Sequence, residues 1–267
     1  METTEEHQHR IRLLVIAGLA AFVTIVFWST IPLLKGKDWV VYFAQLAVYL
    51  VLYALALWGL RMEGIHLSIG MNSVLQALGW LLLGWVAYAL ILHVSGLARL
   101  PDELQSLGAL PAGRLMANIV STWFFVGFGE ELLFRGYILL SYRRHFTHGT
   151  PGRRALAALV VSSIFFSLWH IPARIASIAS GEMAPMLLIP SSIFVFLVGL
   201  GLGYLFLRTG NILLAGLAHG VTDLPLLGMH VQSLVPPQNM ILLIILVFLE
   251  ICRRTRREKA EAWPLMQ

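Results

Sequence analysis

Three short polar clusters interrupt apolar stretches of the sequence, and their residue types could carry chemistry. They span Glu130–Arg135, Phe166–His170 and His219–Asp223, and together they contain three carboxylates, one guanidinium and two imidazoles. An ionised side chain at the centre of a bilayer costs about 2.5–3.5 kcal/mol even on the scale derived from insertion experiments. Groups this costly indicate a function, and we expect the clusters to meet in a polar cavity within the membrane.

The first cluster combines a candidate base with a candidate ion pair. Glu131 and Arg135 are four residues apart, so on a helix they lie on one face and can pair. Glu130 is rotated by about 100° from Glu131 and can point elsewhere. Gly127 and Gly129 leave room for a close neighbour, as small residues do between membrane helices. The pattern predicts a structural pair and a free carboxylate; a purely structural polar lock is the alternative, although adjacent like charges suit it poorly.

The other two clusters each supply one histidine. His170 follows Phe166 at a four-residue spacing and precedes Pro172, which can bend or end a helix. His219 and Asp223 are again four apart, and a carboxylate at that spacing can fix the tautomer and orientation of an imidazole. Each pair alone is a weak motif, and a lone histidine in an apolar helix is more often a core residue. The ordered set of three is a strong signal.

Composition predicts the elements that must position these residues. The 267 residues are 58% hydrophobic and 12% charged, against about 25% charged in an average soluble domain. A helical span needs about 20 apolar residues, and the apolar runs predict an all-α, polytopic integral membrane protein with about eight transmembrane helices. The predicted spans lie near residues 11–34, 39–60, 74–94, 115–140, 155–175, 186–207, 212–229 and 240–252.

The basic residues are distributed unevenly across the predicted topology. Of the 19 Lys and Arg residues, thirteen fall on the face that holds both termini and five on the opposite face. The positive-inside rule therefore predicts cytoplasmic termini in a multi-pass protein, which we expect in the plasma (cell) membrane. The basic tail at residues 253–259 fits attraction to anionic membrane lipids. The net charge of +5 is explained in this way, and we predict no nucleic-acid partner.

The polar clusters also divide the chain. We predict N-terminal scaffold helices over residues 1–100, a catalytic core over 101–235, and a last transmembrane helix with a basic cytoplasmic tail over 236–267. Residues 97–114, with two prolines, are predicted to form an external loop.

The three motifs, in their order, resemble those of the CAAX-protease and bacteriocin-processing family of intramembrane endopeptidases, also called the Abi family. The resemblance covers about residues 115–228. It implies an eight-helix membrane protein and peptide-bond hydrolysis. By position, Glu130 resembles the carboxylate that activates water, and Glu131 with Arg135 resembles the supporting pair of the first motif.

The resemblance also implies roles for the other polar residues. His170 resembles the histidine of the second motif, and His219 with Asp223 resembles the pair that helps to bind an oxyanion. The third motif commonly ends in Asn, whereas this chain has Asp223. A negative charge there is a poor oxyanion donor, so an ionised Asp223 is expected to orient His219 instead.

The chemistry of these residue types agrees with a glutamate-type mechanism. Glu130, assisted by His170, would take a proton from water, and His219 would donate to the oxyanion that forms on the peptide carbonyl. We predict no cofactor. Zinc is the competing hypothesis, with Glu130, His170, His219 and Asp223 as its ligand set, because catalytic zinc uses three protein ligands and a water.

Two other classes of function remain open at this point. Membrane-embedded Glu, His and Asp also build transporters and proton relays, and a non-catalytic immunity protein could keep the same cavity for binding alone. The expected partners are membrane lipids and a membrane-associated peptide or protein substrate, either prenylated (CAAX-type) or bacteriocin- or leader-like. The sequence does not identify the substrate or the oligomeric state.

Overall fold

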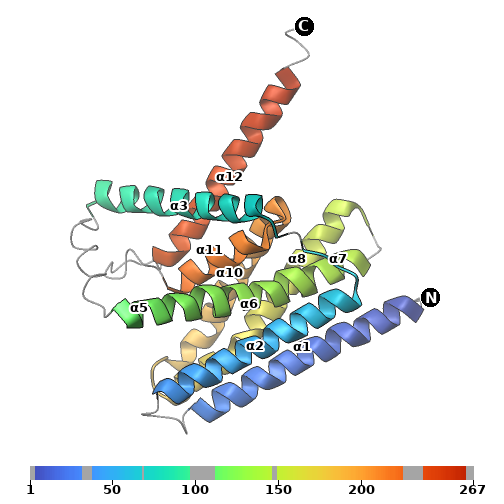
Figure 1. Cartoon of the computed structure of the whole chain (residues 1–267), viewed down its shortest axis with the longest axis vertical. Coiled ribbons are helices and arrows are strands. Elements are labelled where there is room, and N and C mark those ends of the chain that lie inside the picture. The colour runs from blue at the N-terminus through green and yellow to red at the C-terminus, as the bar shows by residue number, and fades with distance from the viewer. Residues whose placement is uncertain are drawn as a thin grey trace.

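A computed structural model describes residues 4–31, 38–67, 69–96, 112–145, 149–224 and 237–262, and within these ranges it contains helices and turns but no strand. The elements are α1 (Thr4–Thr30), α2 (Asp38–Met62), α3 (Met71–Val94), α5 (Ala112–Ile119), η2 (Val120–Gly127), α6 (Phe128–Glu131), η3 (Leu132–Leu139), α7 (Leu140–His145), α8 (Pro151–Trp169), α9 (Ile171–Ala179), η4 (Pro185–Leu187), α10 (Leu188–Thr209), α11 (Ile212–Asp223) and α12 (Pro237–Ala262). Figure 1 shows their arrangement.

Five helical segments among the described residues are long and apolar enough to cross a membrane. They are His7–Thr30, Phe43–Met62, Met71–Val94, Pro151–Ala179 and Pro185–Thr209. They coincide with the first three, the fifth and the sixth predicted spans, so the protein is an all-α, multi-pass membrane protein. Helices also occupy 112–145 and 237–262, and α11 has 12 residues, but these are not among the five. The total of eight spans stays a prediction, and most of the predicted external loop lies outside the described residues.

Residues 112–145 form the central helix of the fold, in which α5, η2, α6, η3 and α7 follow one another without a break. In Figure 1, α1 and α2 lie along one side of it, and α3, α11 and α12 lie on the other. Two π-helical stretches, η2 and η3, flank the single α-helical turn α6 that carries the two glutamates. Departures of this kind from regular α-helix are frequent at functional sites.

Glycines let α11 approach the central helix at backbone distance. A Cβ atom added at Gly127 would lie 2.6 Å from both the carbonyl oxygen of Gly216 and the amide nitrogen of Gly220. A Cβ at Gly220 would in turn lie 2.5 Å from the Cα of Trp123. Only glycine fits such contacts, as is common between membrane helices. The predicted close neighbour of Gly127 is therefore the backbone of α11.

The ends of α8 and α11 fix two of the functional segments. Helix α8 ends at Trp169, and α9 starts at Ile171 with Pro172 in its first turn, so His170 lies at the joint between them. Helix α11 begins after Asn211, whose side chain accepts a hydrogen bond from Leu214 N at 3.1 Å and donates one to Ser73 O at 2.7 Å. Asn211 thus caps α11 and ties it to α3.

Candidate active site

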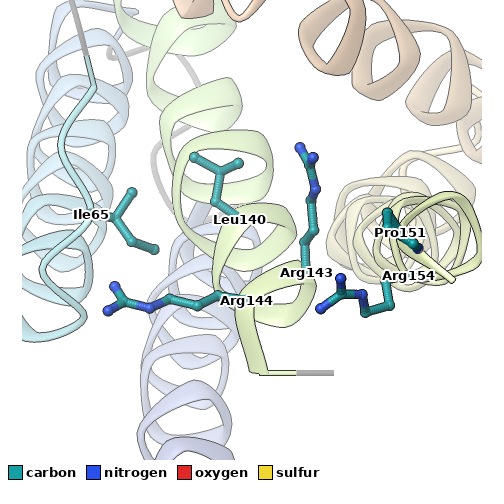
Figure 2. Close-up of a pocket in the computed structure, with 6 residues that line it drawn as sticks. All are labelled: Ile65, Leu140, Arg143, Arg144, Pro151 and Arg154. Carbon is teal, nitrogen blue, oxygen red and sulfur yellow. The ribbon is translucent and has the colours of Figure 1, made fainter. Parts of the chain in front are cut away.

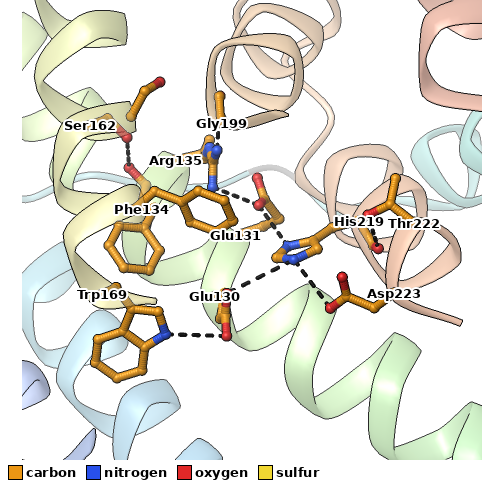
Figure 3. A network of polar contacts seen from close by, with 12 residues as sticks. Glu130, Glu131, Phe134, Arg135, Ser162, Trp169, Gly199, His219, Thr222 and Asp223 are labelled. Carbon is orange, nitrogen blue, oxygen red and sulfur yellow. Dashed lines mark hydrogen bonds and ion pairs between the residues drawn. The ribbon is translucent and has the colours of Figure 1, made fainter. Parts of the chain in front are cut away.

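Glu130 lies on α6 with 2% of its surface exposed, and Figure 3 shows it between Trp169 and His219. One carboxylate oxygen, Oε1, accepts hydrogen bonds from the hydroxyl of Tyr49 at 2.9 Å and from the indole N–H of Trp169 at 3.2 Å. These two donors come from α2 and α8. A buried charged group needs such partners, because leaving it unpaired costs far more than an ordinary hydrogen bond contributes. The two contacts hold the carboxylate in one orientation.

The second oxygen of Glu130, Oε2, is buried and makes no hydrogen bond to the described part of the chain. It faces Nε2 of His170 at 3.7 Å and Nε2 of His219 at 3.9 Å. Both separations are too long for a direct hydrogen bond and suit a bridging water molecule. Oε2 of Glu130 therefore faces one imidazole nitrogen of each histidine, at distances that a water molecule could bridge.

Glu131 connects Arg135 to His219. Its Oε1 accepts from Nη1 of Arg135 at 2.7 Å and lies 3.0 Å from Nδ1 of His219. Arg135 also donates through Nη2 to the carbonyl of Gly199 at 2.9 Å, and both Glu131 and Arg135 are fully buried. The predicted ion pair is therefore present, and its carboxylate also positions the histidine of α11.

Asp223 occupies a more exposed position than the other carboxylates. Its side chain is 40% exposed, and Oδ2 lies 3.5 Å from Nε2 of His219. We expected Asp223 to orient His219, but the nitrogen that Asp223 approaches is the one facing Glu130, and the shorter contact to the ring comes from Glu131 at Nδ1. The predicted contact between Asp223 and His219 is therefore present, Glu131 is a second and closer partner of the ring, and the role of Asp223 in orienting it stays a prediction.

His170 is oriented by its own helix. Its Nδ1–H donates a hydrogen bond to the carbonyl oxygen of Phe166 at 2.8 Å. In the neutral ring, Nε2 then carries the lone pair that faces Glu130. The ring of Phe166 packs against both imidazoles, with its centroid 4.7 Å from that of His170 and 5.4 Å from that of His219, and the guanidinium of Arg135 lies 4.4 Å from the same centroid. The ring of Phe166 thus lies in contact with both imidazoles and with the guanidinium group.

A pocket of about 210 Å³ opens onto this network. Glu130, His170, Trp169 and Asp223 line it together with residues of α1 and α2. Sequence reasoning missed the contribution of these two helices, and Tyr49 in particular, because one tyrosine in an apolar helix carries no signal of its own. The division of the chain at about residue 100 stays a prediction, and the pocket contains residues from both sides of it.

The ligand set proposed for zinc does not converge. Among the described residues, the group whose His, Cys, Asp or Glu ligand atoms all lie within 4.8 Å of one another is His9, Glu63 and His145. The set of Glu130, His170, His219 and Asp223 does not meet that criterion, and so it does not fit a single metal ion as it stands. The cluster at Glu63 is a separate one, in which His9 and His145 contact the carboxylate at 3.1 and 2.6 Å.

A comparison with known proteins finds a family match over the segment that contains the candidate site. Residues 112–225 match the family model described as "Type II CAAX prenyl endopeptidase Rce1-like". No curated protein and no solved structure matches the chain. The matched segment contains the Glu130–Arg135, Phe166–His170 and His219–Asp223 motifs, and the resemblance inferred from these motifs is thereby confirmed. Over residues 112–225, the chain is therefore similar to the Rce1-like type II CAAX prenyl endopeptidases.

Proposed function

We propose that the protein is an intramembrane endopeptidase that hydrolyses a peptide bond of a membrane-associated substrate with a water molecule activated by Glu130. The observation that carries the proposal is the buried Oε2 of Glu130, which makes no hydrogen bond to the described residues and faces two imidazole nitrogens. The family match favours this function over a transporter or proton relay and over a non-catalytic immunity protein.

The proposed reaction begins with proton transfer. Oε2 of Glu130 takes a proton from the water while Nε2 of His170 helps to hold that water in place. The hydroxide attacks the carbonyl carbon of the substrate, and the electron pair of the C=O bond moves to oxygen. His219 acts as an imidazolium: Nδ1–H donates to Glu131, and Nε2–H donates a hydrogen bond to that oxyanion, which is the kind of preorganised stabilisation that often dominates acyl transfer.

The second step breaks the peptide bond. The tetrahedral intermediate collapses, the C–N bond breaks, and Glu130 returns its proton to the departing amine nitrogen. The products are a carboxylic acid and an amine, which become a carboxylate and an ammonium group once the acid proton passes to the amine, and Glu130 is again ionised. Glu131 and Arg135 stay in place throughout as positioning residues, because they hold His219 without touching the reacting atoms.

A second pocket supports a substrate with a hydrocarbon chain, as in a prenylated CAAX-type protein. This pocket of about 330 Å³ is lined almost entirely by apolar side chains of α1, η3 and α8 and by Pro172 of α9. Thr24 and Trp169 line both this pocket and the one at Glu130. An apolar chain seated there would hold the attached peptide beside the activated water, so its binding energy would serve to position the reacting bond.

The setting of the reaction is part of the proposal. We propose that the protein lies in the plasma membrane with both termini in the cytoplasm, and the thirteen-to-five distribution of basic residues supports this orientation. We propose that the reaction needs no metal ion. Removal of divalent metals with a chelator should leave the cleavage rate unchanged, and a loss of activity that zinc restores would contradict this.

The experiment that tests the function compares cells that carry the wild type or Glu130→Ala at matched membrane levels. New protein termini are identified in both membrane fractions. Termini present with the wild type and absent with Glu130→Ala would support the protease and reveal its cleavage preference. Glu182→Ala is a matched control, because Glu182 is an exposed carboxylate outside the network, and it should leave the termini unchanged. Identical termini in all samples would contradict the proposal.

A further inference from the structure

A second polar pocket lies away from the candidate active site, where α7 ends and α8 begins. It has a volume of about 320 Å³ and is lined by Ile65, Leu140, Arg143, Arg144, Pro151 and Arg154. Figure 2 shows that the arginines come from two helices, with Arg143 and Arg144 on the helix that carries Leu140 and Arg154 on α8 beside Pro151. Three guanidinium groups therefore line one pocket, and none of its described lining residues is acidic.

The hydrogen bonding of these arginines leaves donors for a ligand. Nη1 of Arg144 donates to the carbonyl oxygen of Glu63, which anchors this side chain but uses only one of its five N–H donors. Nε of Arg154 is buried and makes no hydrogen bond to the described residues. A buried donor without a partner costs about 1–3 kcal/mol. An anion in the pocket would satisfy it, and clustered guanidinium groups match the oxygens of a phosphate.

The position of the pocket relative to the membrane helices favours the phosphate of a lipid over a soluble phosphate. The span on α2 ends at Met62, three residues before Ile65, and the span on α8 begins at Pro151. The pocket therefore lies at the end of two spans, level with the lipid headgroups. Ile65 and Leu140 add an apolar wall that suits the glycerol and the first methylene groups of a lipid, which a soluble phosphate lacks.

We propose that this pocket binds the phosphate group of an anionic glycerophospholipid. A bound lipid would join α7 to α8. Helix α7 continues the central helix that carries Glu130, and α8 ends directly before His170. Basic pockets between helix ends at the cytoplasmic side of a membrane bind anionic headgroups by this chemistry. The proposal does not rest on the protease activity, because it concerns binding at a different place in the molecule.

The test measures lipid binding by native mass spectrometry of the full-length protein in a neutral detergent. Phosphatidylglycerol is titrated, with phosphatidylcholine of the same acyl chains as the zwitterionic control. An arginine near the membrane surface contributes about fivefold to the affinity for anionic lipid, and two contribute about 25-fold. Arg154→Gln should therefore weaken binding of phosphatidylglycerol about fivefold, and Arg143→Gln with Arg154→Gln about 25-fold.

The matched control is Arg153→Gln, which removes one exposed guanidinium beside Arg154 that does not line the pocket. It should change the affinity less than twofold. Equal losses for Arg153→Gln and Arg154→Gln would overturn the proposal, because binding would then follow overall charge. Displacement of the lipid by inorganic phosphate at equal concentration would also overturn it in favour of a free-anion site. Thermal unfolding in phosphatidylcholine checks that the variants are folded, and Arg154→Lys, which keeps the charge, should recover part of the affinity if the site is intact.

Discussion

Adding one methyl group at Gly127 should separate the two helices that bring Glu131 to His219. The Cβ atom of Gly127→Ala would lie 2.6 Å from the carbonyl oxygen of Gly216 and from the amide of Gly220. Ordinary van der Waals contact begins at 3.4 Å, so the backbones must move apart by about 0.8 Å. Neither neighbour has a side chain that can turn away, and the displacement therefore falls on α11 itself.

The displacement is large compared with the contacts of the candidate site. The 3.0 Å contact between Glu131 and His219 would lengthen to about 3.8 Å, which exceeds hydrogen-bonding distance. A misplacement of about 1 Å in a catalytic group can cost about 100-fold in rate, so kcat should fall by one to two orders of magnitude. Overpacking of this kind also costs about 1–3 kcal/mol of stability.

The assay pairs the cleavage rate with thermal unfolding of the purified protein. Gly79→Ala is the matched control, because a Cβ at Gly79 in α3 meets no atom within 4 Å. Alanine is a better helix former than glycine by about 1 kcal/mol, so the control should be as active as the wild type and at least as stable. If Gly127→Ala behaves like Gly79→Ala in both measurements, the close packing of α11 does not position His219 and the reasoning is refuted.

Three further predictions concern buried polar contacts. Glu131→Gln leaves the fully buried Arg135 without its charge partner and should lower the free energy of unfolding by about 3–5 kcal/mol; a loss below 1 kcal/mol would show that the pair is not buried. Asn211→Ala removes the cap of α11 and should cost about 1–2 kcal/mol in thermal unfolding, whereas an unchanged melting temperature would argue against the cap. Burial alone would raise the pKa of Glu63, but hydrogen bonds with His9 and His145 outweigh burial and lower it below 4.5. Glu63 therefore stabilises the fold above about pH 4.5, and this contribution is lost as the pH falls through its lower folded-state value. The melting temperature of Glu63→Gln should vary less with pH below 4.5 than that of the wild type, and parallel curves would contradict this.

The sequence predicted the membrane class and the key polar residues because each carries a local signal. Runs of about 20 apolar residues identify spans without tertiary information. The four-residue spacing of Glu131 and Arg135 placed them on one helix face, and the contact of 2.7 Å is the expected result. Pro172 likewise indicated the break between two helices at which His170 lies.

Contacts between residues far apart in the chain leave no comparable signal in the sequence. Nothing near Tyr49 indicates that its hydroxyl reaches Glu130, 81 positions later in the chain. The spacing of His219 and Asp223 favoured a local pair, but the tertiary fold brings Glu131 to the other ring nitrogen of His219. The arginines around Arg154 were interpreted only as topology signals, because a pocket between α7 and α8 exists only once those helices are packed.

The central claim is that Glu130 activates water, and cleavage by purified Glu130→Gln tests it most directly. The amide keeps the shape of the side chain and can still contact Tyr49 and Trp169, but it cannot accept the proton of the water. The wild type and the variant are reconstituted at equal amounts, and the cleavage rate is measured on a substrate identified from the cellular termini. The account predicts a rate at least about 100-fold lower for Glu130→Gln, with an unchanged thermal unfolding profile. A folded Glu130→Gln protein that cleaves at the wild-type rate would contradict the account.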